Sequence, residues 1–159
     1  METTMSDINI GLTENARQNI AHSLSSLLAD SYTLYLKTQN FHWNVTGPRF
    51  QEVHALTEMH YTDLAAAIDA IAERIRALGE FAPGSYSSYQ KLATLKEEAG
   101  VPAANEMLAV LAKDHEQIAR NIREALPAAQ EATDESSASL LSDRLSVHEK
   151  TAWMLRSMV

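Results

Sequence analysis

Apolar residues recur at steps of three and four along most of this 159-residue chain, which is the pattern of amphipathic helices. The steps predict four long helices, at about residues 13–41, 48–79, 103–126 and 134–158. In the second of these, the apolar positions from Tyr61 to Leu78 form one continuous stripe. We therefore predict an all-α fold, a four-helix bundle.

The segment between the second and third predicted helices has a different composition. Phe81–Tyr89 is rich in Pro, Gly, Ser and Tyr and interrupts the helical pattern. Residues 90–98 can form one short helix, so we expect a long crossover that joins the two halves of the bundle. Pro102 and Pro127 flank the third helix, and Thr133 is a candidate N-cap of the fourth.

The length suits a single domain. We expect residues 1–12 to be a flexible N-terminal segment and residues 13–159 to form the bundle. The first residues lack the basic and apolar regions of a signal peptide, and no apolar run approaches the roughly 18 residues of a membrane span. A cytoplasmic protein without membrane contact is the expectation.

Imidazole and carboxylate side chains are concentrated between residues 40 and 74. His42 and His54 supply imidazoles, while Glu58, Asp69 and Glu73 supply carboxylates. Such a mixed nitrogen and oxygen set suits a borderline divalent metal such as Fe(II). The chain has no cysteine, which excludes sulfur ligation.

One copy of the second predicted helix cannot close such a site. His54 and Glu58 share one helix face, and so do Asp69 and Glu73. The distance along the helix from His54 to Asp69 is about 22 Å, far more than one metal centre spans. If two copies pack antiparallel about a two-fold axis, the histidine end of one faces the acidic end of the other, and two equivalent sites form.

The other histidines are interpreted differently. His115 and His148 fall in step with apolar neighbours and are expected to be core residues rather than ligands. His22 and His60 have no carboxylate at a convincing spacing. No Glu is followed three residues later by His, so the Glu-x-x-His motif of di-iron centres inside a single bundle is absent. Glu58 is either a ligand or an ordinary surface residue.

The motif His-Trp-Asn-Val from His42, followed by His54, Asp69 and Glu73 at offsets of twelve, twenty-seven and thirty-one, resembles the Dps family. Dps proteins are the twelve-subunit branch of the ferritin-like superfamily. The resemblance covers about residues 13–157. It implies a ferritin-like four-helix bundle, with a short helix in the crossover, that assembles into a hollow dodecamer.

The resemblance also implies a function, that of an iron-storage ferroxidase. Such a protein oxidises Fe(II) at non-haem centres, with hydrogen peroxide preferred over oxygen, and stores the Fe(III) mineral, which protects against oxidative damage. The two histidines would hold the first iron together with Asp69 and Glu73 of the neighbouring chain. Glu58 would bridge to or hold a second iron, and Trp43 would lie beside the metal.

Two acidic residues, Asp134 and Glu135, open the fourth predicted helix. They can simply compensate the helix dipole, which requires no function. In Dps-like shells, acidic residues near this point line pores whose negative potential draws Fe(II) inward. Both interpretations stay open.

DNA binding is the property for which this chain departs from many Dps proteins, which bind DNA through a lysine-rich terminal extension. Residues 1–16 contain no Lys or Arg, and the net charge is −8. Because phosphate binding depends on basic charge, we expect DNA binding to be absent or feeble. The alternatives are a nucleoid-binding Dps protein that compacts DNA, and a structural assembly with a vestigial metal site.

Overall fold

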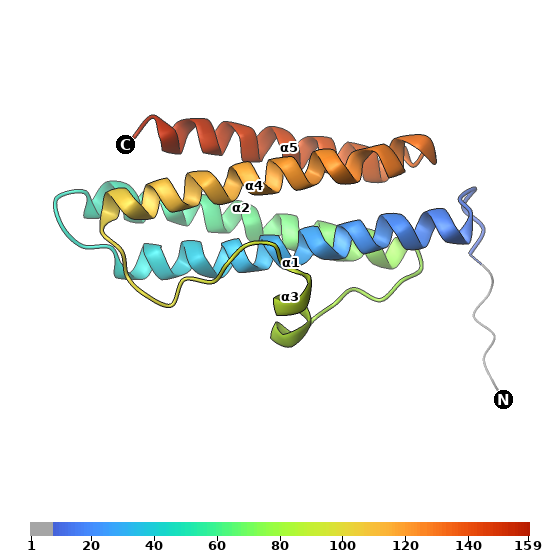
Figure 1. The fold of residues 1–159 in the computed structure, drawn as a ribbon, viewed down its shortest axis with the longest axis horizontal. Coiled ribbons are helices and arrows are strands. Elements are labelled where there is room, and N and C mark those ends of the chain that lie inside the picture. Colours follow the sequence, from blue (N-terminus) through green and yellow to red (C-terminus); the bar gives the residue numbers. More distant parts are fainter. Residues whose placement is uncertain (1–7) are drawn as a thin grey trace.

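The computed structural model describes residues 8–159, and this part of the chain forms four long helices and one short helix with no strand (Figure 1). The helices are α1 (Glu14–Asn44), α2 (Phe50–Ala77), α3 (Tyr86–Leu92), α4 (Ala104–Glu131) and α5 (Glu135–Arg156). The predicted all-α four-helix bundle with a short crossover helix is confirmed. Within residues 8–159, no helix has the length and hydrophobicity needed to cross a membrane.

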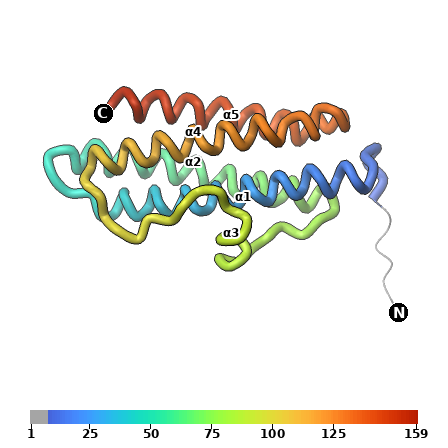
Figure 2. The backbone as a smooth tube through the Cα atoms, in the orientation of Figure 1, coloured from blue at the N-terminus to red at the C-terminus, as the bar shows by residue number. Residues whose placement is uncertain are grey.

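The bundle consists of two helical hairpins joined by the crossover. α1 packs against α2, α4 packs against α5, and the two hairpins meet mainly through α1 and α4. The crossover runs from the end of α2 back along α1 to the start of α4, so α2 and α4 point in the same direction (Figure 2). Helix α3 lies on the outside of the bundle against α1.

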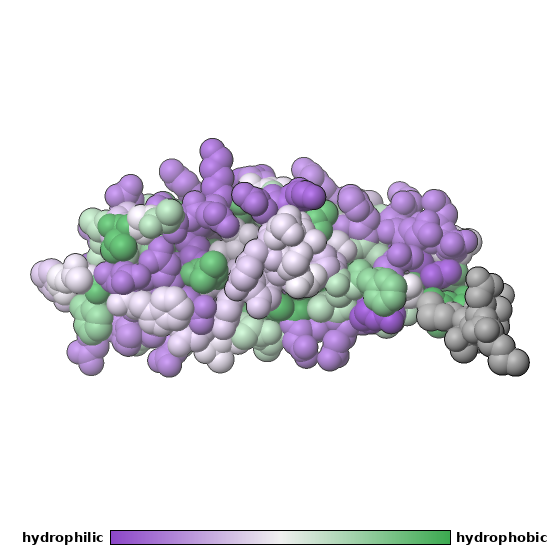
Figure 3. Space-filling view, turned by 90° about the horizontal axis from the view of Figure 1, so that it is seen from below, coloured by the Kyte–Doolittle hydropathy of each residue, from purple (hydrophilic) through white to green (hydrophobic). Residues whose placement is uncertain are grey.

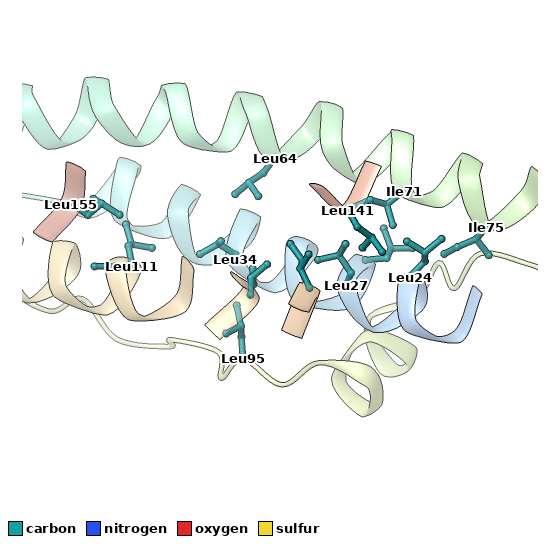
Figure 4. Packing of buried hydrophobic residues seen from close by; sticks show 14 of the residues in the cluster. Leu24, Leu27, Leu34, Leu64, Ile71, Ile75, Leu95, Leu111, Leu141 and Leu155 are labelled. Atoms are coloured by element: carbon teal, nitrogen blue, oxygen red, sulfur yellow. The ribbon is translucent and has the colours of Figure 1, made fainter. Parts of the chain in front are cut away.

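The core is a column of aliphatic side chains between the four long helices (Figure 4). Leu34 of α1, Leu64 of α2, Leu111 of α4 and Leu155 of α5 are all buried. Each lies on the apolar stripe that its helix was predicted to carry, so the bundle follows from periodic burial of apolar surface. The face that carries α3 is mostly hydrophilic, with hydrophobic side chains in separate patches (Figure 3).

A single buried carboxylate holds the crossover on the bundle. Asp30 of α1 accepts hydrogen bonds from the backbone N–H of Thr94 (2.7 Å) and of Leu95 (3.0 Å). It also accepts bonds from the Thr94 hydroxyl (2.8 Å) and the Asn121 amide (3.0 Å). A buried charge requires such complete pairing. Asp30 therefore fixes the crossover between α1 and α4.

Two local predictions about caps and short helices were wrong. The short helix begins at Tyr86 rather than at residue 90, because the Ser85 hydroxyl accepts from the backbone N–H of Ser88 and caps it. The N-cap of α5 is Asp134, whose carboxylate accepts from the backbone N–H of Ser137, whereas Thr133 lies before it with φ +57°.

The end of α4 and the N-terminal segment were also predicted from the sequence. α4 continues beyond Pro127 to Glu131, because the last turn buries Ala129 completely. Of the expected flexible segment 1–12, residues 1–7 lie outside the described residues. Ile8 lies against Gly79 at the end of α2.

A buried histidine pair links α4 to α5. The guanidinium of Arg144 donates to Nε2 of His148 (3.3 Å), so the proton of this imidazole is on Nδ1 and is donated to Nδ1 of His115 (2.8 Å). His60 of α2 packs edge-on against His115. Arg144 is also paired with Asp63 at the edge of the bundle. The interpretation of His115 and His148 as core residues agrees with this geometry.

Burial governs the protonation of this pair. Burial, and then the positive charge of Arg144, lowers the pKa of His148 to about 3. Burial also lowers the pKa of His115 well below its ordinary value, with smaller contributions from His148, His60 and Arg144. Both imidazoles are therefore neutral in the folded protein at pH values where an unfolded chain would protonate them.

We predict that the free energy of unfolding falls as the pH is lowered from 7 to 5. The unfolded chain takes up protons on both imidazoles below about pH 6.5 and the folded chain does not, so each contributes up to about 1.4 kcal/mol per pH unit. In the double variant His115→Leu/His148→Leu, the free energy of unfolding should change less with pH. Urea unfolding at a series of pH values and a fixed protein concentration measures this slope, and His22→Gln at an exposed position is the control. An unchanged slope in the double variant would contradict this assignment.

Candidate metal centre

A tight connection between α1 and α2 brings two histidines together. α1 ends at Asn44, Val45 is buried, and Gly47 turns the chain with φ +100°, a conformation that favours glycine. As a result, the last turn of α1 lies beside the first turns of α2. The rings of His42 and His54 stack there with their centroids 3.8 Å apart and their planes 13° from parallel.

Each of these histidines is held by the backbone of the other. Nδ1 of His42 lies 2.6 Å from the carbonyl oxygen of His54, and Nδ1 of His54 lies 2.7 Å from the carbonyl oxygen of His42. A carbonyl oxygen only accepts, so both Nδ1 atoms carry the proton and donate it. In the neutral imidazole, this leaves the lone pair on Nε2, which is the tautomer that ligates a metal.

Three further side chains fix the histidine pair, and the sequence analysis missed them. Phe50 stacks on His54 at 5.0 Å, and Tyr61 packs edge-on against His42 at 5.1 Å. The Thr57 hydroxyl lies 3.3 Å from Nδ1 of His42 and donates to its own helix. All three occur at helical spacings of three, four and seven from His54, which was the available signal.

The predicted acidic ligands do not join the histidines within one protomer. Glu58, Asp69 and Glu73 are exposed on α2, and Asp69 and Glu73 lie one helical turn apart near its far end. In the part of the chain described, no three or more His, Cys, Asp or Glu side chains are grouped closely enough to hold a metal. A protomer therefore presents two separate half-sites. Trp43, which follows the first histidine, is 59% exposed.

The predicted pore residues differ in their surroundings. Asp134 is buried and forms a 2.7 Å ion pair with Arg74 of α2, in addition to capping α5. Burial alone would raise the pKa of Asp134, but hydrogen bonds from Ser137 and Arg74 outweigh it and keep the pKa below its ordinary value. Glu135 is exposed. A pore role for either residue stays a prediction.

Comparison with known proteins agrees with the fold and with the motif. Residues 21–159 match the family model of the ferritin-like domain. A low temperature-induced protein of Nostoc sp. is 48% identical over 157 residues, which cover 98% of this chain and 88% of the relative. DNA protection during starvation protein 2 of Bacillus anthracis is 34% identical, over 89% of this chain and 97% of the relative.

Solved structures give the same result. The Dps protein of Vibrio cholerae O1, described as a member of a broad superfamily of ferritin-like diiron-carboxylate proteins, is similar with a TM-score of 0.92 and 34% identity, over 99% of both chains. A Dps protein of Bacillus brevis gives a TM-score of 0.88 and 33% identity, over 91% of this chain and 97% of the other. The chain therefore belongs to the Dps family of ferritin-like proteins.

Proposed function

We propose that this protein oxidises Fe(II) at centres shared by two protomers and stores the Fe(III) product inside a hollow shell of twelve subunits. The observation that supports it most directly is the stacked pair of His42 and His54, with both Nε2 lone pairs free. Their tautomer is fixed by hydrogen bonds to backbone carbonyls, so the pair is prepared for a metal ion without rearrangement. Membership of a ferritin-like family supports iron as that ion.

The carboxylates complete the centre from the partner protomer. Asp69 and Glu73 share a face of α2, and a two-fold axis that packs two copies of α2 antiparallel carries them to the histidines of the other copy. Glu58, one turn after His54, is placed to bridge to a second Fe(II). Trp43 then lies at the edge of the centre. Because the iron has few protein ligands, it is bound weakly, and weak binding allows the product to be released into the shell.

We propose hydrogen peroxide as the oxidant of this cytoplasmic protein. One peroxide takes one electron from each of two Fe(II) ions, which gives two Fe(III) ions and two hydroxide ions. Because both electrons come from iron, no hydroxyl radical is released, and the reaction protects the cell. The exposed Glu135 and the buried Asp134 are candidates for the acidic lining of an entry pore.

We predict that two inactive variants restore each other when they are assembled together. His54→Ala damages the histidine half of each site, and Asp69→Ala damages the acidic half. A mixed dimer contains one intact site and one doubly damaged site, so random mixing at equal amounts should return about a quarter of the wild-type sites. Peroxide-dependent Fe(II) oxidation, followed by absorbance after co-refolding, measures the recovery.

The control pair for this experiment is His22→Ala with Asp143→Ala, which are exposed positions outside the proposed centre. Each of these variants should be as active as the wild type alone and in mixtures. Co-assembled His54→Ala and Asp69→Ala shells that are no more active than either variant would rule out a site shared in this way.

We predict a stable dodecamer of about twelve times the 17.6 kDa chain mass. The exposed carboxylates of α2 are half-sites without function in a lone protomer, so assembly is required for activity. Light scattering at neutral pH measures the mass. A monomer, or a shell of twenty-four subunits, would be incompatible with the proposal.

The alternative function, DNA compaction, is suggested by relatives named for DNA protection. We predict that DNA binding is weak, because the chain has a net charge of −8 and non-specific affinity depends on basic residues. The guanidinium of Arg49 also forms an ion pair with Glu52 and donates hydrogen bonds to Asn105 and to the carbonyl of Met158. A gel-shift assay with linear DNA at about 50 mM salt and pH 7.5 should show no retardation. A clear shift without added divalent metal would favour the nucleoid-binding function.

A further inference from the structure

A cavity of about 410 Å³ lies between α1, α3 and the part of the crossover that follows α3. These elements lie together on the outer side of the bundle (Figure 1). The volume falls within the range of small-molecule sites, roughly 300–1,000 Å³. None of the candidate metal ligands lines this cavity, which is therefore separate from the proposed iron centre.

The wall that the crossover contributes is held at both ends. Asp30 of α1 accepts a hydrogen bond from the backbone N–H of Thr94 (2.7 Å) at one end. At the other end, the side-chain amide of Asn40 donates to the carbonyl oxygens of Glu98 and Gly100, both at 3.1 Å. The cavity is thus formed before a ligand arrives, and binding does not have to order this wall.

Aromatic and aliphatic side chains make up much of the remaining lining. Tyr32 of α1 and Tyr89 of α3 stack with their centroids 4.9 Å apart, and both line the cavity. Two exposed apolar side chains, Leu36 at 46% and Tyr86 at 76%, line it as well. Such a surface is complementary to a flat aromatic ring.

Lys37 adds a buried hydrogen-bond donor to this lining. The residue is only 6% exposed, and its ammonium donates to Asp114 of α4 at 2.8 Å. An ammonium carries three N–H donors, and within residues 8–159 it makes no second hydrogen bond. Thr33, another polar residue of the lining, already donates to the carbonyl of Ala29. Lys37 is therefore the donor that an acceptor entering the cavity would satisfy.

The charges around the cavity determine what kind of acceptor fits. Lys37 and Lys96 are positive, whereas Asp114, Glu97 and Glu98 are negative. An anionic ligand would add a negative charge where carboxylates already outnumber ammonium groups. A cationic ligand would place its charge against the ammonium of Lys37. A neutral acceptor, such as a carbonyl oxygen, avoids both penalties.

We propose that this cavity binds a neutral, planar aromatic compound that carries a carbonyl group. The ring lies against the aromatic and aliphatic wall, and the carbonyl oxygen accepts a hydrogen bond from Lys37. Compounds of the quinone and alloxazine classes have this combination of a flat ring and carbonyl acceptors. The inference goes beyond the proposed function, since it needs neither iron nor the candidate metal ligands.

The test uses the assembled, iron-free protein and lumichrome, a neutral alloxazine, in equilibrium dialysis at pH 7. Tyr86→Ala removes the exposed ring from the cavity. Phe81→Ala removes a ring that is 82% exposed but does not line the cavity, and it is the matched control. Lys37→Met/Asp114→Leu removes the donor together with its partner, because Lys37→Met alone would leave a buried carboxylate unpaired.

We expect saturable binding of lumichrome to the wild type and, with equal affinity, to Phe81→Ala. Tyr86→Ala should bind several-fold more weakly, and Lys37→Met/Asp114→Leu about tenfold more weakly, because the acceptor loses its donor. The aromatic anion 2-naphthoate should bind the wild type more weakly than lumichrome does. Lumichrome should also raise the Tm of the wild type, since it binds only the folded chain.

Three results would overturn the proposal. The first is the absence of saturable lumichrome binding to the assembled wild type, as expected if a second copy of the chain covers the cavity. The second is unchanged affinity in Tyr86→Ala, or in Lys37→Met/Asp114→Leu where circular dichroism shows that variant to be folded. The third is 2-naphthoate binding as tightly as lumichrome. All these measurements are made without iron, so their failure leaves the proposed function standing.

Discussion

The reciprocal hydrogen bonds between His42 and His54 are the interaction on which the candidate centre depends. Each imidazole donates to the backbone carbonyl of the other, so neither ring can turn without leaving a polar group unpaired. The same two bonds tie the end of α1 to the start of α2. Folding of the first hairpin and preparation of the metal-binding tautomer are therefore one event, and no later step has to orient these ligands.

The crossover gives the bundle the geometry that the rest of the site uses. Because it spans the length of the molecule, α2 is left with one long exposed face, and this face carries all three candidate carboxylates. Asp30 holds the crossover against α1 with three charge-assisted hydrogen bonds and accepts a fourth from Asn121 of α4. The neighbouring Tyr32 lies two residues further along α1 and meets Tyr89 of α3 there. Fixing the crossover thus also fixes the stacked pair of Tyr32 and Tyr89.

The sequence predicted the helices well because burial is periodic, and it predicted the candidate ligands because their types and spacing form a motif. It did not predict the stacking of His42 on His54, since the tautomer and ring orientation depend on a turn at Gly47 whose path is set by packing. The caps at Ser85 and Asp134 were missed for a related reason. Several Ser, Thr and Asp residues compete at each helix start, and only the backbone conformation of the folded chain selects one.

The spacing of the carboxylates predicted that they need a second copy, but the structure of one protomer cannot display the completed site. Asp69 and Glu73 are too far along α2 to reach the histidines of their own protomer, and within residues 8–159 no other group of side chains replaces those histidines as partners for a metal. Exposed carboxylates at one end of a helix and prepared imidazoles at the other are complementary only in an antiparallel pair. In the proposed dimer, a two-fold axis perpendicular to α2 brings both halves together twice, and assembly is then a condition of the chemistry as well as of the shell.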